Sequence, residues 1–307
     1  MSILIDESTT FIVQGITGRE AVNLTRECRE YGAGARIVGG VTPGRRGREV
    51  HGVPVFDTVQ QAVAHHEAPI DGSVVTVPPA FCRDAVFEAV ESGVKLVVIV
   101  TERIPRRDVA EMVELAGLRG ARIIGPNCLG IIVPDVVKMG GIGGPARDAA
   151  KAYSPGPIGV ISRSGGMTTE MSSTLTAAGL GQSTAVSIGG DAIIGSTYAE
   201  LMPLFEGDEN TEGIVIYTEP GGRMEAELAR WVTDNESRLP IVAFMAGRFM
   251  DDMPGMSFGH AGTIVEGKDD TATEKIARLA EAGITVADEI SQIPDITRSK
   301  MRDRSAA

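Results

Sequence analysis

Residues 10–21, TFIVQGITGREA, decide the fold of this chain. The apolar Phe-Ile-Val run predicts a buried strand. Gly15 and Gly18 then form a tight turn, and a helix begins at about Arg19. A strand, a glycine turn and a helix in this order are typical of the first unit of a parallel sheet that is covered by helices.

The same alternation of short β-branched runs and amphipathic segments continues along the chain. We predict strands near residues 10–14, 36–38, 72–77, 95–100 and 122–124, and again at 158–162, 184–188, 213–217, 240–244 and 285–287. The stretch 136–157 between these groups is rich in glycine and proline, so we expect no regular structure there. A chain of 307 residues is long enough for two domains. We therefore predict an α/β protein with parallel sheets in two domains, residues 1–145 and 146–307.

Two helices can be placed from their end signals. Apolar residues spaced at helical intervals over 109–116 are followed by Gly120, which is typical of a helix end. Thr271 and Glu274 have the spacing of a capping box, which predicts a helix that begins after Thr271.

Charge and cysteine content exclude several kinds of partner. The net charge is −12, so a general phosphate-backbone binder is excluded and no nucleic acid is expected. The longest apolar run, 94–100, is far shorter than the roughly 20 residues that span a bilayer, and the N-terminus lacks the features of a secretory signal. Three scattered cysteines (Cys28, Cys82, Cys128) fit a reducing cytoplasm, and no cluster of ligands predicts a metal site.

The glycine turn at residues 15–18 suits a phosphate group. Backbone N–H groups and the positive end of the helix dipole meet there, although a turn without a ligand has equal weight from this motif alone. A nicotinamide dinucleotide site would have an acid about 20 residues further on. Here residues 39–46 are GGVTPGRR, and Arg45 favours a nucleotide with an extra ribose phosphate, such as CoA or NADP, unless that loop is merely solvated. Residues 77–81 and 100–102 follow two further strands and would line the same crevice.

In the second half, His260 lies in a loop between glycines, and its imidazole can act as a nucleophile near neutral pH. Glu219 ends an apolar strand, where its carboxylate could bind one imidazole nitrogen and leave the other free. Residues 162–170 form a small-residue turn at the start of a helix, which is a second anion site. From spacing alone, an exposed histidine, a solvated acid and an ordinary serine cap remain open.

Five motifs together make the chain recognisable. It resembles the α subunit of succinyl-CoA synthetase, and the related segment of ATP-citrate lyase, from the N-terminus to about residue 290. The motifs that carry the resemblance are GGVTPG at 39–44, GPNC at 125–128, SRSG at 162–165, IGGD at 188–191 and GHAG at 259–262.

The resemblance implies a Rossmann-like CoA-binding domain followed by a flavodoxin-like domain in which His260 is transiently phosphorylated and Glu219 hydrogen-bonds to it. It also implies two groups of ligand contacts. The CoA contacts would be Thr17, Gly18, Arg19, Glu20 and Arg45, with Val100, Thr101 and Glu102 near the other end of CoA. The helix start that stabilises the phosphoryl group would be formed by Ser162, Ser164, Gly165 and Gly166. The family usually has Lys at position 45 and Ser-Gln at 19–20, so Glu20 would face a polyanion.

The implied reaction has three steps. ATP or GTP phosphorylates His260, the phosphoryl group moves to a carboxylic acid, and CoA displaces phosphate to give the thioester. No part of the chain resembles a nucleotide-binding domain, and the P-loop motif is absent. The resemblance therefore implies a separate ATP-grasp β subunit, which carries the nucleotide and Mg²⁺, in an αβ or α₂β₂ assembly.

The chain departs from the succinate enzymes where the acid would lie. Thr169 stands where they have Tyr, which opens room, and Gly166-Met167 is similar to the citrate enzyme. We expect a small di- or polycarboxylic acid, with a citrate- or malate-type ligase as the alternative and a non-catalytic CoA-binding subunit as a second alternative. Asp251 and Asp252 precede His260 and either alter docking of the β subunit or are simply solvated.

Overall fold

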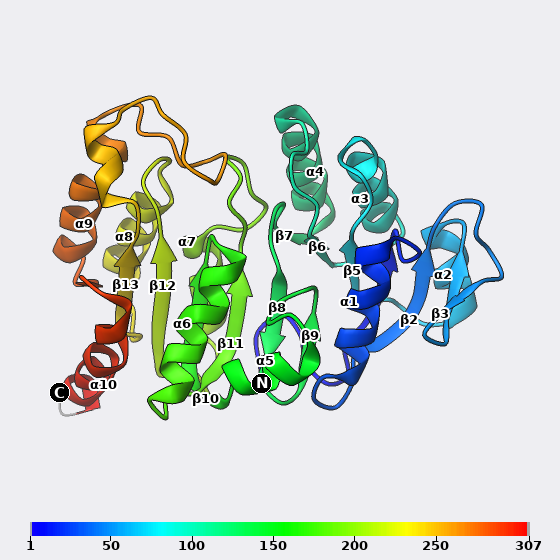
Figure 1. Cartoon of the computed structure of the whole chain (residues 1–307), viewed down its shortest axis with the longest axis horizontal. Coiled ribbons are helices and arrows are strands. Elements are labelled where there is room, and N and C mark those ends of the chain that lie inside the picture. Colours follow the sequence, from blue (N-terminus) through cyan, green and yellow to red (C-terminus); the bar gives the residue numbers. More distant parts are fainter. Residues whose placement is uncertain (1, 306–307) are drawn as a thin grey trace.

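The computed structural model describes residues 2–305. Its helices and strands form two α/β units that lie side by side along the long axis of the molecule (Figure 1). Each unit is built on a seven-stranded sheet. The predicted α/β class with two units is therefore confirmed, and most of the strands in each sheet are parallel.

The first sheet has the strand order β3-β4-β2-β1-β5-β6-β7 and is parallel except for β3. Its strands are β1 (Thr10–Gln14), β2 (Arg36–Val41), β3 (Glu49–Val50), β4 (Val53–Phe56), β5 (Gly72–Val75), β6 (Leu96–Ile99) and β7 (Arg122–Ile124). Its helices are α1 (Arg19–Glu30), α2 (Val59–His66), η1 (Pro79–Phe81), α3 (Cys82–Glu91) and α4 (Arg106–Arg119).

The second sheet has the order β14-β13-β12-β10-β11-β8-β9. Its strands are β8 (Gly130–Val133), β9 (Val137–Met139), β10 (Pro155–Ser162), β11 (Gln182–Ser187), β12 (Gly213–Thr218), β13 (Ile241–Met245) and β14 (Thr285–Ala287). The helices are α5 (Ala146–Ala152), α6 (Gly165–Ala177), α7 (Tyr198–Glu206), α8 (Met224–Asn235), η2 (Arg248–Asp252), η3 (Lys268–Asp270), α9 (Ala272–Glu281), η4 (Ile290–Gln292) and α10 (Ile293–Ser305).

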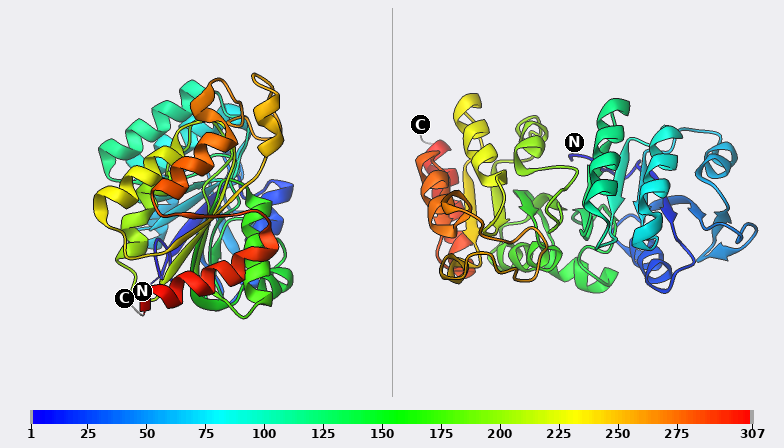
Figure 2. Two further views of the ribbon diagram at one scale, coloured as in Figure 1. Left: turned by 90° about the vertical axis from the view of Figure 1, so that its left-hand side faces the viewer. Right: turned by 90° about the horizontal axis from the view of Figure 1, so that it is seen from above.

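The sheets are formed by continuous apolar runs because helices cover both of their faces. Every residue of the central strands β1 and β12 is buried. In the second unit α7, α8 and α9 pack on one face of the sheet, and α5, α6 and α10 pack on the other (Figure 2). Among residues 2–305, no helix is both long and apolar enough to cross a membrane.

Two expectations about regular structure are wrong. The stretch 136–157 contains β9, α5 and the start of β10, because its positive-φ glycines (Gly140, Gly143, Gly144) lie in the turns and leave the segments between them regular. The second sheet is also not wholly parallel, since β8 runs antiparallel to β11 and to β9. The domain boundary at residues 145/146 stays a prediction, and β8 and β9 precede it.

The helix-end signals are confirmed for α4, whose C-cap is Gly120 with φ 63°. For α9, the predicted start after Thr271 is confirmed, because the hydroxyl of Thr271 accepts the N–H of Glu274. The second half of the capping box is not formed, since the side chain of Glu274 pairs with Lys268 instead. The segment between β13 and α9, which carries His260, arches over the carboxyl ends of β12 and β13 (Figure 1). The fold thus brings this segment to the edge where ligands of open α/β sheets bind.

Candidate active site

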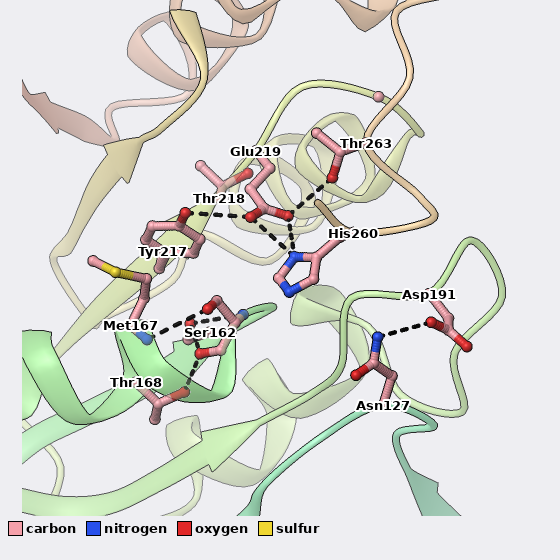
Figure 3. A network of polar contacts seen from close by, with 12 residues as sticks. Asn127, Ser162, Met167, Thr168, Asp191, Tyr217, Thr218, Glu219, His260 and Thr263 are labelled. Atoms are coloured by element: carbon pink, nitrogen blue, oxygen red, sulfur yellow. Dashed lines mark hydrogen bonds and ion pairs between the residues drawn. The ribbon is translucent and has the colours of Figure 1, made fainter. Parts of the chain in front are cut away.

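His260 and Glu219 are hydrogen-bonded to each other. Glu219 directly follows β12, and the segment between β13 and α9 brings the ring of His260 next to it (Figure 3). His260 Nδ1 lies 3.0 Å from Glu219 Oε1 and 2.8 Å from Oε2. Because a carboxylate can only accept hydrogen bonds, Nδ1 carries the proton, and in the neutral ring Nε2 keeps its lone pair. The sequence-predicted pair is therefore brought together with one ring nitrogen available as a nucleophile.

The carboxylate of Glu219 is almost enclosed, with 11% of its side chain exposed. It accepts further hydrogen bonds from the hydroxyls of Tyr217 and Thr263, each at 3.2 Å. Burial alone would raise the pKa of Glu219, but the hydrogen bond from His260 and the positive charge of Arg163 outweigh burial, so the pKa is lowered. Glu219 is thus a negatively charged partner that fixes the tautomer of His260.

The start of α6 faces the other side of the imidazole. Ser164 caps the helix by accepting the N–H of Met167, and the hydroxyl of Ser162 donates to the carbonyl of Ser164 at 2.7 Å. A Cβ on Gly165 would lie 2.3 Å from the side chain of Leu129, whereas a Cβ on Gly166 would meet nothing within 4 Å. In Figure 3 the ring nitrogen not bonded to Glu219 lies towards the Ser162 turn. Because the first N–H groups of a helix lack intrahelical partners, this place suits an anion next to Nε2.

Thr169 lies one turn into α6, and its hydroxyl is 3.0 Å from the hydroxyl of Tyr153. Tyr153 itself is buried, being 1% exposed. The Thr169 side chain is thus directed to the C-terminal end of α5.

Arg163 is a site residue to which the sequence analysis gave no role. It is 1% exposed, and its Nε and Nη1 have no hydrogen-bond partner among the residues that the structure describes. A Cβ on Gly262 would lie 2.3 Å from Arg163 Nη2, so the His260 segment passes directly over this guanidinium. The motif SRSG at 162–165 was a signal for this role, because a charged residue at the end of a buried strand is expected to have a structural or functional partner.

The imidazole of His260 packs on the IGGD motif of the second unit. A Cβ on Gly190 would lie 2.4 Å from ring atoms of His260. Asp191 accepts a hydrogen bond of 3.0 Å from the side chain of Asn127, which follows the cis peptide bond Gly125–Pro126. This contact ties the segment that connects the two units to the loop beneath His260.

The glycine turn of the first unit is an open cradle. Gly15 has φ 85°, and a Cβ there would lie 2.9 Å from Thr76 Oγ1, so the turn approaches β5 closely. Gly18 is the N-cap of α1, and no side chain caps the helix. The hydroxyl of Thr17 is 3.2 Å from that of Thr42 at the end of β2. The first N–H groups of α1 are therefore available for a phosphate group, which fits the expected use of this turn.

Charged side chains surround this cradle. Arg19 and Glu20 form an ion pair of 3.1 Å in which both side chains are strongly exposed. Arg45 is exposed, and its N–H bonds to the carbonyl of Thr42 at 3.1 Å, so it stands one turn beyond the residue that contacts Thr17. Thr17, Gly18, Arg19, Glu20 and Arg45 thus belong to one edge of the first sheet.

Val100, Thr101 and Glu102 follow β6 and continue this edge towards the second unit. The hydroxyl of Thr101 donates to the carbonyl of Val77 at 2.7 Å, and its carbonyl accepts the N–H of Asn127. Glu102 lines a cavity of about 240 Å³. The same cavity is lined by Asn127, Asp191 and the two residues that flank His260, Gly259 and Ala261. Glu102, which follows the first-sheet strand β6, therefore lies in the same cavity as the two neighbours of His260.

Asp251 has a structural contact that answers one of the open alternatives. Its carboxylate accepts the N–H groups of Ala272 and Thr273 at 2.7 and 3.0 Å, so it binds the start of α9 rather than being solvated. Asp252 is exposed.

Comparisons with known proteins identify the two halves of the chain. Residues 6–103 match the family model described as CoA binding domain, and residues 155–299 match the one described as Succinyl-CoA ligase like flavodoxin domain. The chain is 43% identical over 295 residues to succinate–CoA ligase [ADP-forming] subunit alpha 1 of Archaeoglobus fulgidus, covering 95% of this chain and 96% of that protein. It is 40% identical to succinate–CoA ligase [ADP-forming] subunit alpha of Aquifex aeolicus, covering 95% and 92%.

A solved structure shows the same fold. ATP citrate lyase of Methanosaeta concilii superposes with a TM-score of 0.90 at 22% identity, covering 99% of this chain and 52% of that one, so this chain spans about half of that protein. The chain belongs to the family of succinate–CoA ligase α subunits.

Proposed function

We propose that this chain is the phosphoryl-accepting α subunit of an ADP- or GDP-forming acid:CoA ligase. The enzyme would join CoA to a small di- or polycarboxylic acid. The observation that carries the proposal is the hydrogen bond between Glu219 and Nδ1 of His260, which leaves Nε2 facing the start of α6. A protein that only binds CoA needs neither of these groups.

His260 and Glu219 are the catalytic pair of this proposal. Nε2 attacks the terminal phosphorus of ATP or GTP, and the bond from that phosphorus to the departing nucleoside diphosphate breaks. A carboxylate oxygen of the acid then takes the phosphoryl group from Nε2, which restores the free imidazole. The thiolate of CoA attacks the acyl carbon and phosphate leaves. Through both phosphoryl transfers Glu219 holds the ring, and the free N–H groups at the start of α6, with Ser162, Ser164, Gly165 and Gly166, stabilise the phosphoryl charge.

CoA is proposed to lie along the edge of the first sheet. The uncapped start of α1 supports this, because its N–H groups at Arg19 and Glu20 suit a phosphate group next to the Gly18 turn. Arg45 supplies the charge for the ribose phosphate. The ion pair with Arg19 neutralises Glu20, which lessens its repulsion of a polyanion. Val100 and Thr101 lead from β6 to Glu102, which borders the cavity near His260, where the thiol end would reach the acyl phosphate.

A separate β subunit of the ATP-grasp type is proposed to supply the nucleotide and Mg²⁺, in an αβ or α₂β₂ assembly. The names of the relatives, which are those of α subunits, support a partner. A reducing, cytoplasmic setting is part of the proposal and is supported by Cys28, Cys82 and Cys128, which are all free and buried.

A citrate- or malate-type acid is the second candidate. It is favoured by the open space at Gly166, where a Cβ would meet nothing within 4 Å. A larger or hydroxylated acid could use that space beside the phosphoryl site.

The proposal is tested on the chain copurified with its β partner. The complex is incubated with Mg²⁺ and γ-labelled ATP or GTP, and acid-labile, base-stable phosphate is measured in the wild type and in His260→Asn. We expect label only in the wild type, and discharge of the label by one member of a panel of acids in the presence of CoA. Tight CoA binding without label from either nucleotide would instead indicate a non-catalytic CoA-binding subunit.

A further inference from the structure

A buried ion pair lies directly behind the Glu219 turn. Lys275 of α9 and Glu225 of α8 approach to 2.6 Å between Nζ and Oε2, and their side chains are 2% and 0% exposed. Such a pair has a large desolvation penalty, and well-packed apolar residues would often serve stability as well or better. Stability alone therefore does not explain why this ion pair is present, whereas the contacts that it makes do.

All three N–H donors of the Lys275 ammonium group are used at this place. Besides Glu225, Nζ donates to the backbone carbonyl of Glu219 at 3.0 Å and to that of Gly221 at 2.5 Å. The other carboxylate oxygen of Glu225 accepts the hydroxyl of Thr218, which immediately precedes Glu219. The ion pair thus holds the chain just before, at and after the carboxylate that orients His260.

The turn held in this way also supports the histidine segment. Gly221 has φ 85°, and a Cβ there would lie 2.5 Å from the carbonyl oxygen of Gly262 and 2.8 Å from the nitrogen of Ile264. The backbone from 262 to 264 therefore rests on the Glu219 turn. Thr263, which lies in this stretch, donates its hydroxyl to Glu219. A shift of the turn would move both halves of the Glu219–His260 hydrogen bond.

Helix α9 is itself anchored to the other side of the histidine segment. Asp251 of η2, which lies near the beginning of the segment, accepts the first N–H groups of α9, which follows the segment. Gly221 also donates its N–H to the carbonyl of Asp270, just before α9, at 2.9 Å. Both ends of the segment and the Glu219 turn are therefore bonded to the N-terminal part of α9 and its flanking residues. Lys275 is the buried residue of α9 that bonds to the Glu219 turn.

We propose that Lys275 and Glu225 are positioning residues for the phosphoryl-accepting pair, and that their buried ion pair fixes Glu219 and the His260 segment in the geometry required for transfer. The inference rests on the proposed function for its kinetic consequence. Its geometric content concerns this chain alone and can be measured without turnover.

The main variant replaces both members of the pair, Lys275→Met with Glu225→Leu. Replacing Lys275 alone would leave a buried carboxylate without a cation and would destabilise the protein for reasons unrelated to positioning. The matched control is Lys268→Met. Lys268 also pairs with a glutamate, Glu274, at 2.9 Å, but its side chain is 84% exposed and makes none of these contacts.

Two readouts separate positioning from folding and from the function itself. The first is the nitrogen and Nδ1-proton NMR signal of His260 in the full chain labelled with ¹⁵N-histidine, which reports the tautomer and its hydrogen bond. The chain has only four histidines, so His260→Asn assigns the signal. The second is the rate of His260 phosphorylation in the complex with the β partner, with CoA binding and a cooperative melting transition as checks of folding.

We expect the double variant to fold and to bind CoA, to lose the hydrogen-bonded Nδ1 proton signal, and to be phosphorylated about 100-fold more slowly, which is the cost of a displacement of about 1 Å in a catalytic group. Lys268→Met should match the wild type. A folded double variant with a wild-type His260 signal and a wild-type rate would overturn the inference. If the wild type itself takes no phosphate, the proposed function fails, and the NMR signal still decides whether the pair positions His260.

Thr218→Val is the second variant and is used if the double variant does not fold. It keeps the side-chain volume and the ion pair but removes the hydroxyl that donates a hydrogen bond to Glu225. We expect a smaller change of the same kind, with a weakened Nδ1 proton signal and a slower rate. No change in either readout would contradict the positioning role.

Discussion

Replacing Glu219 by Gln isolates the charge of the carboxylate from its shape. Glutamine has the same size, and its amide can still meet the hydroxyls of Tyr217 and Thr263, which lie 3.2 Å from the two carboxylate oxygens. The amide oxygen can also accept the Nδ1 proton of His260. The variant should therefore fold and keep the site intact, while the negative charge beside the imidazole is lost.

The size of the effect follows from the hydrogen bond that loses its charge. Nδ1 of His260 is 2.8 and 3.0 Å from the two oxygens of Glu219, which is the range of a charge-assisted bond. Hydrogen bonds to charged groups contribute about 1.5–3 kcal/mol. The bond should strengthen as the ring gains positive charge on accepting a phosphoryl group. Loss of that contribution in the transition state corresponds to a phosphorylation rate that is lower by roughly 10- to 150-fold.

The rate is measured by rapid quenching of a single turnover with γ-labelled nucleotide in the complex with the β partner. Glu266→Gln is the matched control, because Glu266 is an exposed residue of the same segment and the change in charge is identical. Thr263→Val removes a long hydrogen bond to the same carboxylate but keeps its charge and its contact with the imidazole, so we expect a smaller decrease, of roughly 2- to 13-fold for about 0.5–1.5 kcal/mol. A Glu219→Gln rate equal to that of Glu266→Gln would refute the orienting role of the carboxylate.

The other predictions concern the two ligand sites and acid stability. Arg45→Gln should weaken CoA binding by about tenfold or more and leave dephospho-CoA binding unchanged, because only CoA has the ribose phosphate that Arg45 is proposed to pair with. Calorimetric titrations measure both affinities, and equal losses for the two ligands would contradict this prediction. Thr169→Tyr should lower kcat/KM for acids larger than succinate by about tenfold relative to succinate, since it adds a ring at the position where the resemblance places the acid. An unchanged ranking of an acid panel would contradict this prediction. The pKa of Glu219 is lowered from its ordinary value of 4.5, so the unfolded chain binds the carboxyl proton more tightly than the folded chain does. The stability contributed by the ionised carboxylate is present above pH 4.5 and is lost as the pH falls through the lower pKa of the folded chain. Melting temperatures of the wild type and Glu219→Gln should therefore differ at neutral pH and converge in acid, and a difference that persists well below 4.5 would be inconsistent with this linkage.

Much of the fold could be predicted because strands that alternate with helices produce a pattern that the antiparallel pairs β3-β4 and β8-β9 do not. Each strand of the expected alternation is present, with ends that differ by a few residues. The strands that were missed belong to these pairs. β3 has two residues, β4 contains Pro54, β8 begins at Gly130, and β9 is followed by Gly140. Pairing at a sheet edge, rather than local propensity, makes these segments strands, and pairing is a property of the tertiary structure.

The site could be predicted where topology places residues together and not where a charged side chain turns inward. Glu219 and His260 follow neighbouring strands of one sheet, so their proximity follows from the strand order. Lys275 was missed because a lysine in an amphipathic helix is usually solvated. Its spacing was nevertheless a signal, since Ala272, Lys275 and Leu279 lie on one face of α9 and are its buried residues.

Two of the motifs that made the chain recognisable, IGGD and GHAG, contain glycines that are required for close approach around the histidine. Gly190 of IGGD leaves the space that the ring of His260 occupies, and Gly262 of GHAG leaves the space of the Arg163 guanidinium. Any side chain at either position would displace the ring or the cation, because the Cβ alone would lie 2.4 or 2.3 Å from them. A sequence that keeps these glycines together with Glu219 and His260 therefore specifies the geometry of the site as well as its chemistry. This explains why a few short motifs, spread over distant parts of the chain, identify the family so specifically.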